Sequence, residues 1–198
     1  MIKNIAEKTT RFFIDKKIIN SDDKEIYDYC FEIACVSFIT HLTVIIIAFV
    51  FNIVVCSLIF LLTFSLFRRI CGGYHARSYG RCTVISLLSF LIFVFFAKIL
   101  RNYDYNFLFS VIGFGVLVLL SPVEDANKPI TEKQYLLLRK IIKIITYVLI
   151  FLFVILKCIQ LDFVFENKYF FSFCYGICLV AFSLVISKLE RRKNNVKT

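Results

Sequence analysis

Long apolar runs, separated by short polar segments, dominate the chain. The longest run covers residues 29–67, and a single helix of that length would measure about 58 Å, roughly twice the hydrocarbon thickness of a bilayer. We therefore expect two membrane-spanning helices joined by a turn at Asn52. Four more apolar segments follow, at residues 83–99, 107–120, 141–161 and 169–187. The pattern predicts an all-α, polytopic integral membrane protein with six transmembrane helices.

The first 20 residues lack the continuous apolar core of a cleavable signal peptide. A helical projection places apolar or small side chains on one side, namely Ile2, Ile5, Ala6, Thr9 and Phe13. The opposite side is polar and carries Lys3, Asn4, Glu7, Lys8 and Arg11. This pattern favours an amphipathic N-terminal helix within residues 1–20, lying at the membrane interface. A solvated cap on the first span is the alternative.

The composition excludes other classes of protein. Hydrophobic residues make up 60% of the 198 residues and charged residues 19%, which is too apolar for a soluble domain of this size. The 24 Phe and only 2 Pro exclude a disordered chain. The polar stretch at residues 121–140 is too short to bury a core of its own. We therefore expect a single membrane domain spanning residues 1–198.

The basic residues are distributed unevenly along the chain, which has a net charge of +10. Four segments hold 20 of the 24 Lys and Arg: the N-terminal segment, residues 68–82, residues 121–143 and the tail at 188–198. Because cytoplasmic loops of membrane proteins are enriched in Lys and Arg, we expect a multi-pass cell-membrane protein with both termini and the 68–82 loop in the cytoplasm. Basic loops also attract anionic lipids, so the charge does not indicate nucleic-acid binding.

Most of the 8 Cys lie within apolar runs, where thiols usually behave as small hydrophobic groups: Cys35, Cys56, Cys158, Cys174 and Cys178. The only histidines are His41 and His75. We therefore predict no metal site and no cofactor. His41 lies deep in the first span, and we expect it to be a packed, hydrogen-bonded core residue.

The loop at residues 68–82 differs from the rest of the chain, because it holds 3 of the 6 Gly, one of the 2 His and 2 of the 8 Cys. Gly72 and Gly73 allow positive φ and close backbone approach just before His75. Cys82 lies where the third span begins, and a helix N-terminus with arginines nearby favours a thiolate.

His75 precedes Cys82 by seven residues, so its imidazole can fold back onto the sulfur. A nucleophile with an adjacent base is the arrangement that covalent acyl transfer requires. A basic re-entrant loop, in which His75 only hydrogen-bonds the backbone, is an equal alternative. Cys71 is a weaker candidate nucleophile, because it is four residues before His75 and not at a helix start.

Two charged residues are candidates for supporting roles. Glu32 is the only carboxylate well placed near a span, where a charge is costly and suggests function. It could orient His75 as the third member of a triad or pair with an arginine, or it could lie in water at the interface. Arg68 could bind acidic substrate residues or an oxyanion, or it could serve as a positive-inside anchor.

The stretch R-R-x-C-G-G-Y-H-A-R-S-x-x-x-C at residues 68–82 resembles the signature of the accessory gene regulator B (AgrB) family. These are membrane-embedded cysteine peptidases that process quorum-sensing propeptides. A weaker match is Pro122 followed by residues 127–130, which resembles the family's cytoplasmic loop after the fourth span. The likeness in size and in apolar segments covers most of the chain, but only the loop from His75 to Cys82 is specific.

The resemblance implies that Cys82 cleaves a small, amphipathic, AgrD-like propeptide near its C-terminal side, with His75 as base and then acid. A thiol or hydroxyl of the substrate would then attack the acyl-enzyme and close a thiolactone or lactone ring. A non-enzymatic peptide exporter or membrane interaction protein is the alternative function. A redox-active dithiol formed by Cys71 and Cys82 is a third. A homodimer is a further candidate arrangement, because six short helices do not readily enclose a dry cleft by themselves.

Overall fold

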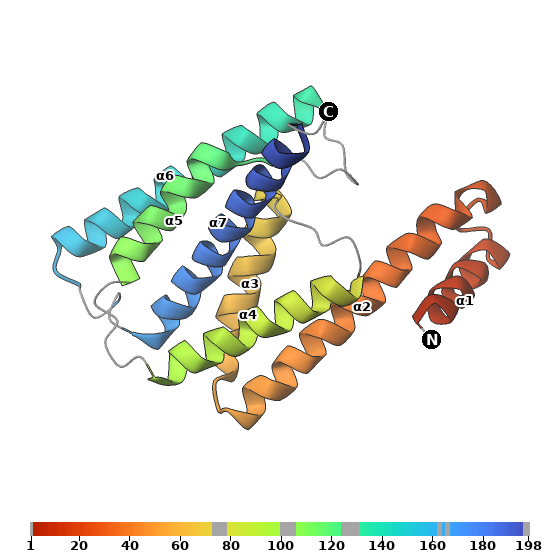
Figure 1. Ribbon diagram of the computed structural model, residues 1–198, viewed down its shortest axis with the longest axis horizontal. Helices are drawn as coiled ribbons and strands as arrows, with labels where there is room; N and C mark the ends of the chain where they lie inside the picture. The colour runs from red at the N-terminus through yellow and green to blue at the C-terminus, as the bar shows by residue number, and fades with distance from the viewer. Residues whose placement is uncertain are drawn as a thin grey trace. The chain divides into compact units, whose positions relative to one another are not determined.

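The computed structural model describes residues 2–72, 79–99, 106–123, 131–161, 164 and 167–195. Seven α-helices account for most of this part of the chain (Figure 1). Their bounds are α1 Ile2–Asp15, α2 Lys24–Val50, α3 Val54–Cys71, α4 Tyr79–Ile99, α5 Asn106–Leu120, α6 Glu132–Cys158 and α7 Lys168–Asn195. A short 3-10 helix, η1, at Ser21–Asp23 precedes α2.

Five helical segments are long and apolar enough to cross a membrane: Ser21–Val50, Val54–Cys71, Gly80–Lys98, Glu132–Cys158 and Lys168–Glu190. Helix α5 is apolar but has only 15 residues. At 1.5 Å per residue it is about 22 Å long, shorter than the hydrocarbon core of about 30 Å. The all-helical membrane architecture is therefore confirmed for the described residues, whereas six complete spans remain a prediction.

The predicted break in the longest apolar run is confirmed. Helix α2 ends at Val50 and α3 begins at Val54, so the turn falls on Asn52. The φ angle of Asn52 is 54°, in the left-handed region. Asparagine enters this region more readily than most residues, since its short polar side chain can hydrogen-bond locally. One polar residue in a run of apolar ones thus ends one helix and lets the next begin.

The chain divides into two compact units, which we describe separately. The first unit contains residues 1–52 and 76–91, and the second contains residues 53–75 and 92–198. Each unit is a part of the chain that packs mainly against itself. The two units do not test the prediction of a single membrane domain, which stays a prediction.

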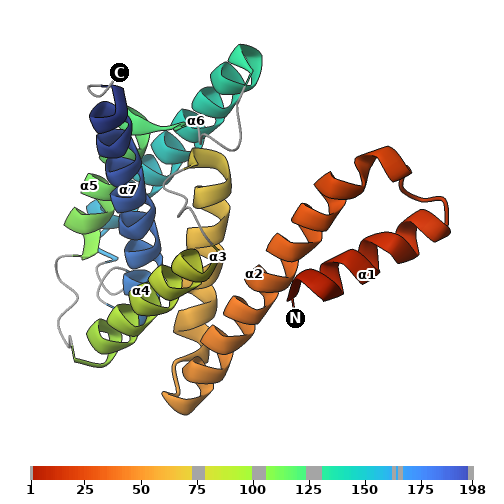
Figure 2. The same ribbon diagram turned by 45° about the vertical axis from the view of Figure 1, so that its right-hand side comes forward.

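In the first unit, α1 folds back along the first half of α2 (Figure 2). Ala6 and Thr10 of α1 are 1% and 0% exposed, and the Phe13 ring stacks on Phe31 of α2 at 5.6 Å between centroids. The N-terminal helix is therefore present, and part of its predicted apolar side is covered by α2. Ile5 remains 47% exposed. The placement of α1 at the membrane interface stays a prediction.

In the second unit, α7 packs against α3 and α5, and α5 packs against α6 (Figure 1). Small residues allow two of these contacts. A Cβ added at Gly113 of α5 would lie 2.9 Å from Ile177 Cγ2, and one added at Gly176 of α7 would lie 3.0 Å from Thr63 Cβ. Close backbone approach at small residues is a common way for helices to associate in membranes.

Large apolar side chains on the outer faces of the helices are widely exposed, for example Phe38 at 69%, Leu62 at 62% and Phe151 at 68%. A soluble protein rarely leaves so many such groups in water. In a bilayer these side chains contact lipid, which accounts for the small buried fraction of the spans.

Candidate active site

Cys82 lies in the first turn of α4, which begins at Tyr79. Its side chain is half-buried and its thiol is free. The first backbone N–H groups of a helix have no partners within that helix and carry partial positive charge. The predicted position of Cys82 at the start of the third membrane helix is therefore correct, and its thiol lies at the end of α4 where these N–H groups are.

The predicted partner of Cys82 falls outside the described part of the chain. Residues 73–78, which include His75 and Gly73, are not among the residues that the structure describes. The pairing of the His75 imidazole with the Cys82 sulfur therefore remains a prediction from their spacing.

Arg68 lies in the last turn of α3, in the second unit. Its guanidinium carbon is 5.6 Å from the centroid of the Phe64 ring, one turn earlier on the same helix. This cation–π contact holds the side chain against its own helix. It is compatible with both predicted roles of Arg68, as an anion-binding group and as an anchor at the membrane surface.

Gly72 ends α3, and its N–H donates to the Arg68 carbonyl oxygen at 3.0 Å. Its φ and ψ are 77° and −149°, a combination essentially restricted to glycine. The prediction that this glycine supplies positive φ is therefore correct. The structure adds a contact that we did not predict, because Gly72 forms a parallel backbone bridge with Val123.

The segment after α5 makes this bridge. Val123 N–H donates to the Cys71 carbonyl oxygen at 3.0 Å. A Cβ at residue 72 would overlap the Val123 carbonyl oxygen. Ser121, Pro122 and Val123 are all buried. No hydrophobic pattern pairs two segments fifty residues apart, and the signal that the sequence did hold was the Gly pair at residues 72 and 73, which allows close backbone approach.

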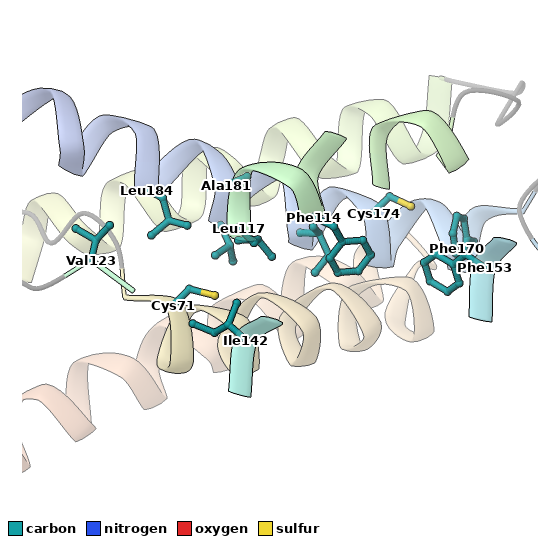
Figure 3. Packing of buried hydrophobic residues seen from close by; sticks show 12 residues of the cluster. Cys71, Phe114, Leu117, Val123, Ile142, Phe153, Phe170, Cys174, Ala181 and Leu184 are labelled. Carbon is teal, nitrogen blue, oxygen red and sulfur yellow. The ribbon is translucent and has the colours of Figure 1, made fainter. Parts of the chain in front are cut away.

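Cys71 points into the core of the second unit (Figure 3). It is 0% exposed, in a cluster that contains Leu117, Val123, Ile142 and Leu184. A sulfur sealed among apolar side chains cannot reach a peptide bond without local unfolding. The structure therefore supports the preference for Cys82 over Cys71 as the nucleophile.

Glu32 is half-buried on α2, in the same unit as Cys82. The one salt bridge seen in the described part of that unit joins Lys24 Nζ and Asp28 Oδ2 at 2.7 Å. No hydrogen bond joins Glu32 to Cys82 among the described residues. Its predicted role in a triad stays a prediction.

His41 is exposed on α2, so the prediction of a packed residue is wrong. Its Nδ1 lies 2.6 Å from the Ser37 carbonyl oxygen, so the predicted hydrogen bond is present. An apolar span has no water-facing side, and burial of a residue on it cannot be read from the sequence alone. The contact with its own helix satisfies one ring nitrogen of this exposed side chain.

Cys174 and Cys178 are four residues apart on α7 and therefore share one face of that helix. Their thiols donate to the carbonyl oxygens of Asn106 and Phe109 of α5, at 3.3 and 3.6 Å. These two thiols therefore help to hold α7 against α5.

The apolar helices, the exposed lipid-type surface and the half-buried thiol at a helix start define an integral membrane protein with a candidate thiol site. The chain belongs to the accessory gene regulator B (AgrB) family, whose model matches residues 6–184. This confirms the resemblance seen in the sequence.

Relatives of known name agree with this assignment. Putative AgrB-like protein 2 of Clostridium perfringens (strain 13 / Type A) is 32% identical over 166 residues, covering 78% of this chain and 75% of its own. A putative AgrB-like protein of Clostridium perfringens (strain SM101 / Type A) is 30% identical over 164 residues, with the same coverage. Accessory gene regulator protein B of Staphylococcus aureus is 36% identical over 88 residues, covering 42% of this chain and 45% of its own. No solved structure matches the chain.

Proposed function

We propose that the chain is a membrane-embedded cysteine endopeptidase that cleaves a small autoinducer propeptide and allows its cyclisation. The observation that carries the proposal is the position of Cys82. In a chain of the AgrB family it is a free, half-buried thiol at a helix start, whereas the neighbouring Cys71 is sealed in the core. Membrane character and family membership support a role in quorum sensing.

The chemistry follows from the two residues of the loop. His75 accepts the thiol proton as Cys82 attacks a peptide carbonyl near the C-terminal side of the propeptide. The carbon–nitrogen bond then breaks, and His75 returns the proton to the leaving amine. The product is a thioester between Cys82 and the N-terminal part of the propeptide, together with a released C-terminal tail.

A thiol or hydroxyl of the same propeptide then attacks the thioester and regenerates Cys82. The result is a thiolactone or lactone ring. Exchange of one thioester for another is nearly balanced, whereas forming a thioester from an amide is uphill, so removal of the tail must supply the driving force. Water would hydrolyse the intermediate to a linear acid, and the site must therefore exclude it. A position at the membrane surface suits this need.

The partner we propose is a short AgrD-like propeptide with an amphipathic helix and an acidic tail. The excess of Lys and Arg in the 68–82 loop and in the segment after α5 favours an acidic partner by long-range attraction. Arg68 is a candidate for contacting that tail or the oxyanion. Both termini and the 68–82 loop are placed in the cytoplasm in this proposal, with the lipid bilayer around α2–α7 and a homodimer allowed.

Cleavage of a co-expressed AgrD-like propeptide tests the proposal. Cys82→Ala and His75→Ala should each abolish cleavage while the protein still inserts into the membrane. Cys30→Ala, which removes an exposed thiol on α2, is the matched control and should cleave normally. A Cys82 adduct that is released by hydroxylamine would identify the thioester. A peptide exporter would tolerate both active-site substitutions.

Glu32→Gln tests the third member of the predicted triad. If Glu32 orients His75, cleavage should slow by about tenfold or more, since general acid–base assistance contributes 10²–10⁴-fold. If Glu32 lies in water at the interface, the rate should not change.

A further inference from the structure

Helix α6 carries a row of lysines along its first half. Lys133, Lys140 and Lys143 recur at the spacing of one side of a helix, with Leu136 between them. We call these three lysines the basic stripe of α6. The buried residues of α6 lie on a different side of the helix: Ile142, Thr146 and Phe153. The stripe is therefore turned away from the core of the second unit, to which all of α6 belongs.

The lysines of the stripe have no carboxylate partner among the residues that the structure describes. Lys133 and Lys140 are exposed and Lys143 is half-buried. The salt bridge seen in those residues lies on α2 and involves none of the three. Glu132 is the only acidic residue in the sequence of α6. This half of the helix therefore keeps a net positive charge, and it attracts anionic groups at a membrane surface.

Large apolar side chains lie among these lysines. Leu136 is 61% exposed and Leu137 is 58% exposed, although both belong to the first two turns of α6. The Thr131 capping box holds these turns in a helix, so the leucines and the lysines keep a fixed arrangement. A soluble anion could neutralise the lysines but would leave the leucines in water. A surface that combines both kinds of side chain fits the boundary between phospholipid headgroups and acyl chains.

The length of α6 places this surface at that boundary. Its 27 residues measure about 40 Å, roughly 10 Å more than the hydrocarbon core of a bilayer. Between Lys143 and Lys157 the helix has no charged residue, so the excess length belongs to the turns that carry the stripe. Helical side chains point toward the N-terminus of their helix. The ammonium group of Lys143 therefore extends toward the headgroups at the start of α6.

We propose that the basic stripe, together with Leu136 and Leu137, is a binding surface for anionic phospholipids in the leaflet at the start of α6. The ammonium groups contact the phosphate-bearing headgroups, and the acyl chains cover the two leucines. Lipid is the occupant that satisfies both the charge and the apolar area of this surface. The proposal does not depend on the peptidase function, and its test does not use cleavage.

The test uses a photoactivatable phosphatidylglycerol whose reactive group lies beside its headgroup. The full chain is reconstituted in phosphatidylcholine vesicles that contain a small fraction of this probe, and mass spectrometry reports the labelled peptides. A phosphatidylcholine probe of the same design is the reference for simple proximity to lipid. The anionic probe should label residues 132–147 at least about threefold more than the reference, because each lysine near the surface strengthens the binding of anionic lipid. Around Lys157 the excess should be smaller.

The triple variant Lys133→Gln, Lys140→Gln, Lys143→Gln removes the charges and keeps long polar side chains. It should lose the excess labelling, while unchanged labelling by the reference probe shows that the helix is still in the membrane. Replacement of the same three residues by arginine should keep the excess. Lys157→Gln, which removes one charge from the opposite end of the same helix, should also keep it. If the triple glutamine variant fails to insert, Lys140→Gln alone should give a partial loss.

Absence of an excess in the wild-type chain, or its persistence in the glutamine variant, would overturn the proposal. An equal loss in Lys157→Gln would assign the effect to net charge and would also overturn it. Soluble competitors at equal ionic strength separate the other occupants. If glycerol phosphate or an acidic peptide removes the excess more effectively than unlabelled phosphatidylglycerol does, the surface binds a phosphate or a peptide and the lipid assignment is wrong.

Discussion

Gly113 of α5 and Ile177 of α7 lie so close that a Cβ at residue 113 would be 2.9 Å from Ile177 Cγ2. The same Cβ would be 3.6 Å from Cys178 Sγ. This contact lets α5, the shortest of the apolar helices, lie against α7 along the second unit. Its tightness makes the packing of the bundle testable with a single methyl group.

Gly113→Ala should destabilise the protein by about 1–2 kcal/mol. Overpacking a tight contact costs about 1–3 kcal/mol, and Ala recovers about 0.5–1 kcal/mol of backbone entropy in a helix. Gly115→Ala, two residues away in open space, gains only the second effect and should be neutral or slightly stabilising. Unfolding by SDS in mixed micelles measures both. Equal stability of the two variants would contradict the contact.

Cys71→Ala should retain propeptide cleavage, because a buried thiol takes no part in the reaction. Cys71→Ser should also retain cleavage, because the Ser121 side chain lies within hydrogen-bonding reach of residue 71 and can pair with the new hydroxyl. The measurement is cleavage per folded molecule, with the folded fraction from size-exclusion chromatography. A dithiol mechanism predicts instead that Cys71→Ala is as damaging as Cys82→Ala.

Cys158 reports whether α5 crosses the membrane. It is exposed at the C-terminal end of α6, the helix that follows α5. If all six segments span, α6 starts in the cytoplasm and Cys158 ends outside the cell. A chain with Cys158 as its only cysteine should then react with an impermeant maleimide in intact cells.

If α5 does not cross, the direction of α6 reverses and Cys158 should react only after the cells are permeabilised. A chain with Cys30 as its only cysteine is the control, because that residue lies near the start of α2. It should require permeabilisation under either topology.

Thr131 caps the N-terminus of α6. Its hydroxyl accepts from the Gln134 N–H at 3.4 Å, and the Gln134 side chain accepts from the Thr131 N–H at 3.2 Å. Thr131→Ala should cost about 1 kcal/mol and fray the first turn, because capping residues contribute about 0.5–2 kcal/mol. Hydrogen exchange of residues 132–136 measures the fraying. Thr131→Ser keeps the acceptor and should exchange at the wild-type rate.

Much of the fold was accessible from the sequence, because span length and turn chemistry are local properties. Asn52 was identifiable as a break, since it lies near the middle of a largely apolar run of 39 residues that is too long for one span. The start of α4 near Cys82 followed from the end of the polar loop. The short length of α5 could also be read from the sequence, because the apolar segment there covers only residues 107–120.

The orientation of side chains within the spans was not accessible. Cys71 faces the core and Cys82 is half-exposed. The residues just before them are nevertheless of similar types, because both cysteines lie within two residues of an arginine. A helix that is apolar on all sides has no periodicity that identifies its buried face. The backbone bridge between Gly72 and Val123 was inaccessible for a different reason, because pairing between distant segments depends on tertiary packing.

The order of the helices in the chain has a consequence for biogenesis. Helix α7 is the shared neighbour of α3 and α5, and it follows both in the sequence. Until the ribosome has produced α7, the face of α5 that carries Gly113 has no helix to pack against. The second unit can therefore mature only after synthesis has passed α7, and a chain stopped before it should be an orphan substrate for membrane quality-control proteases.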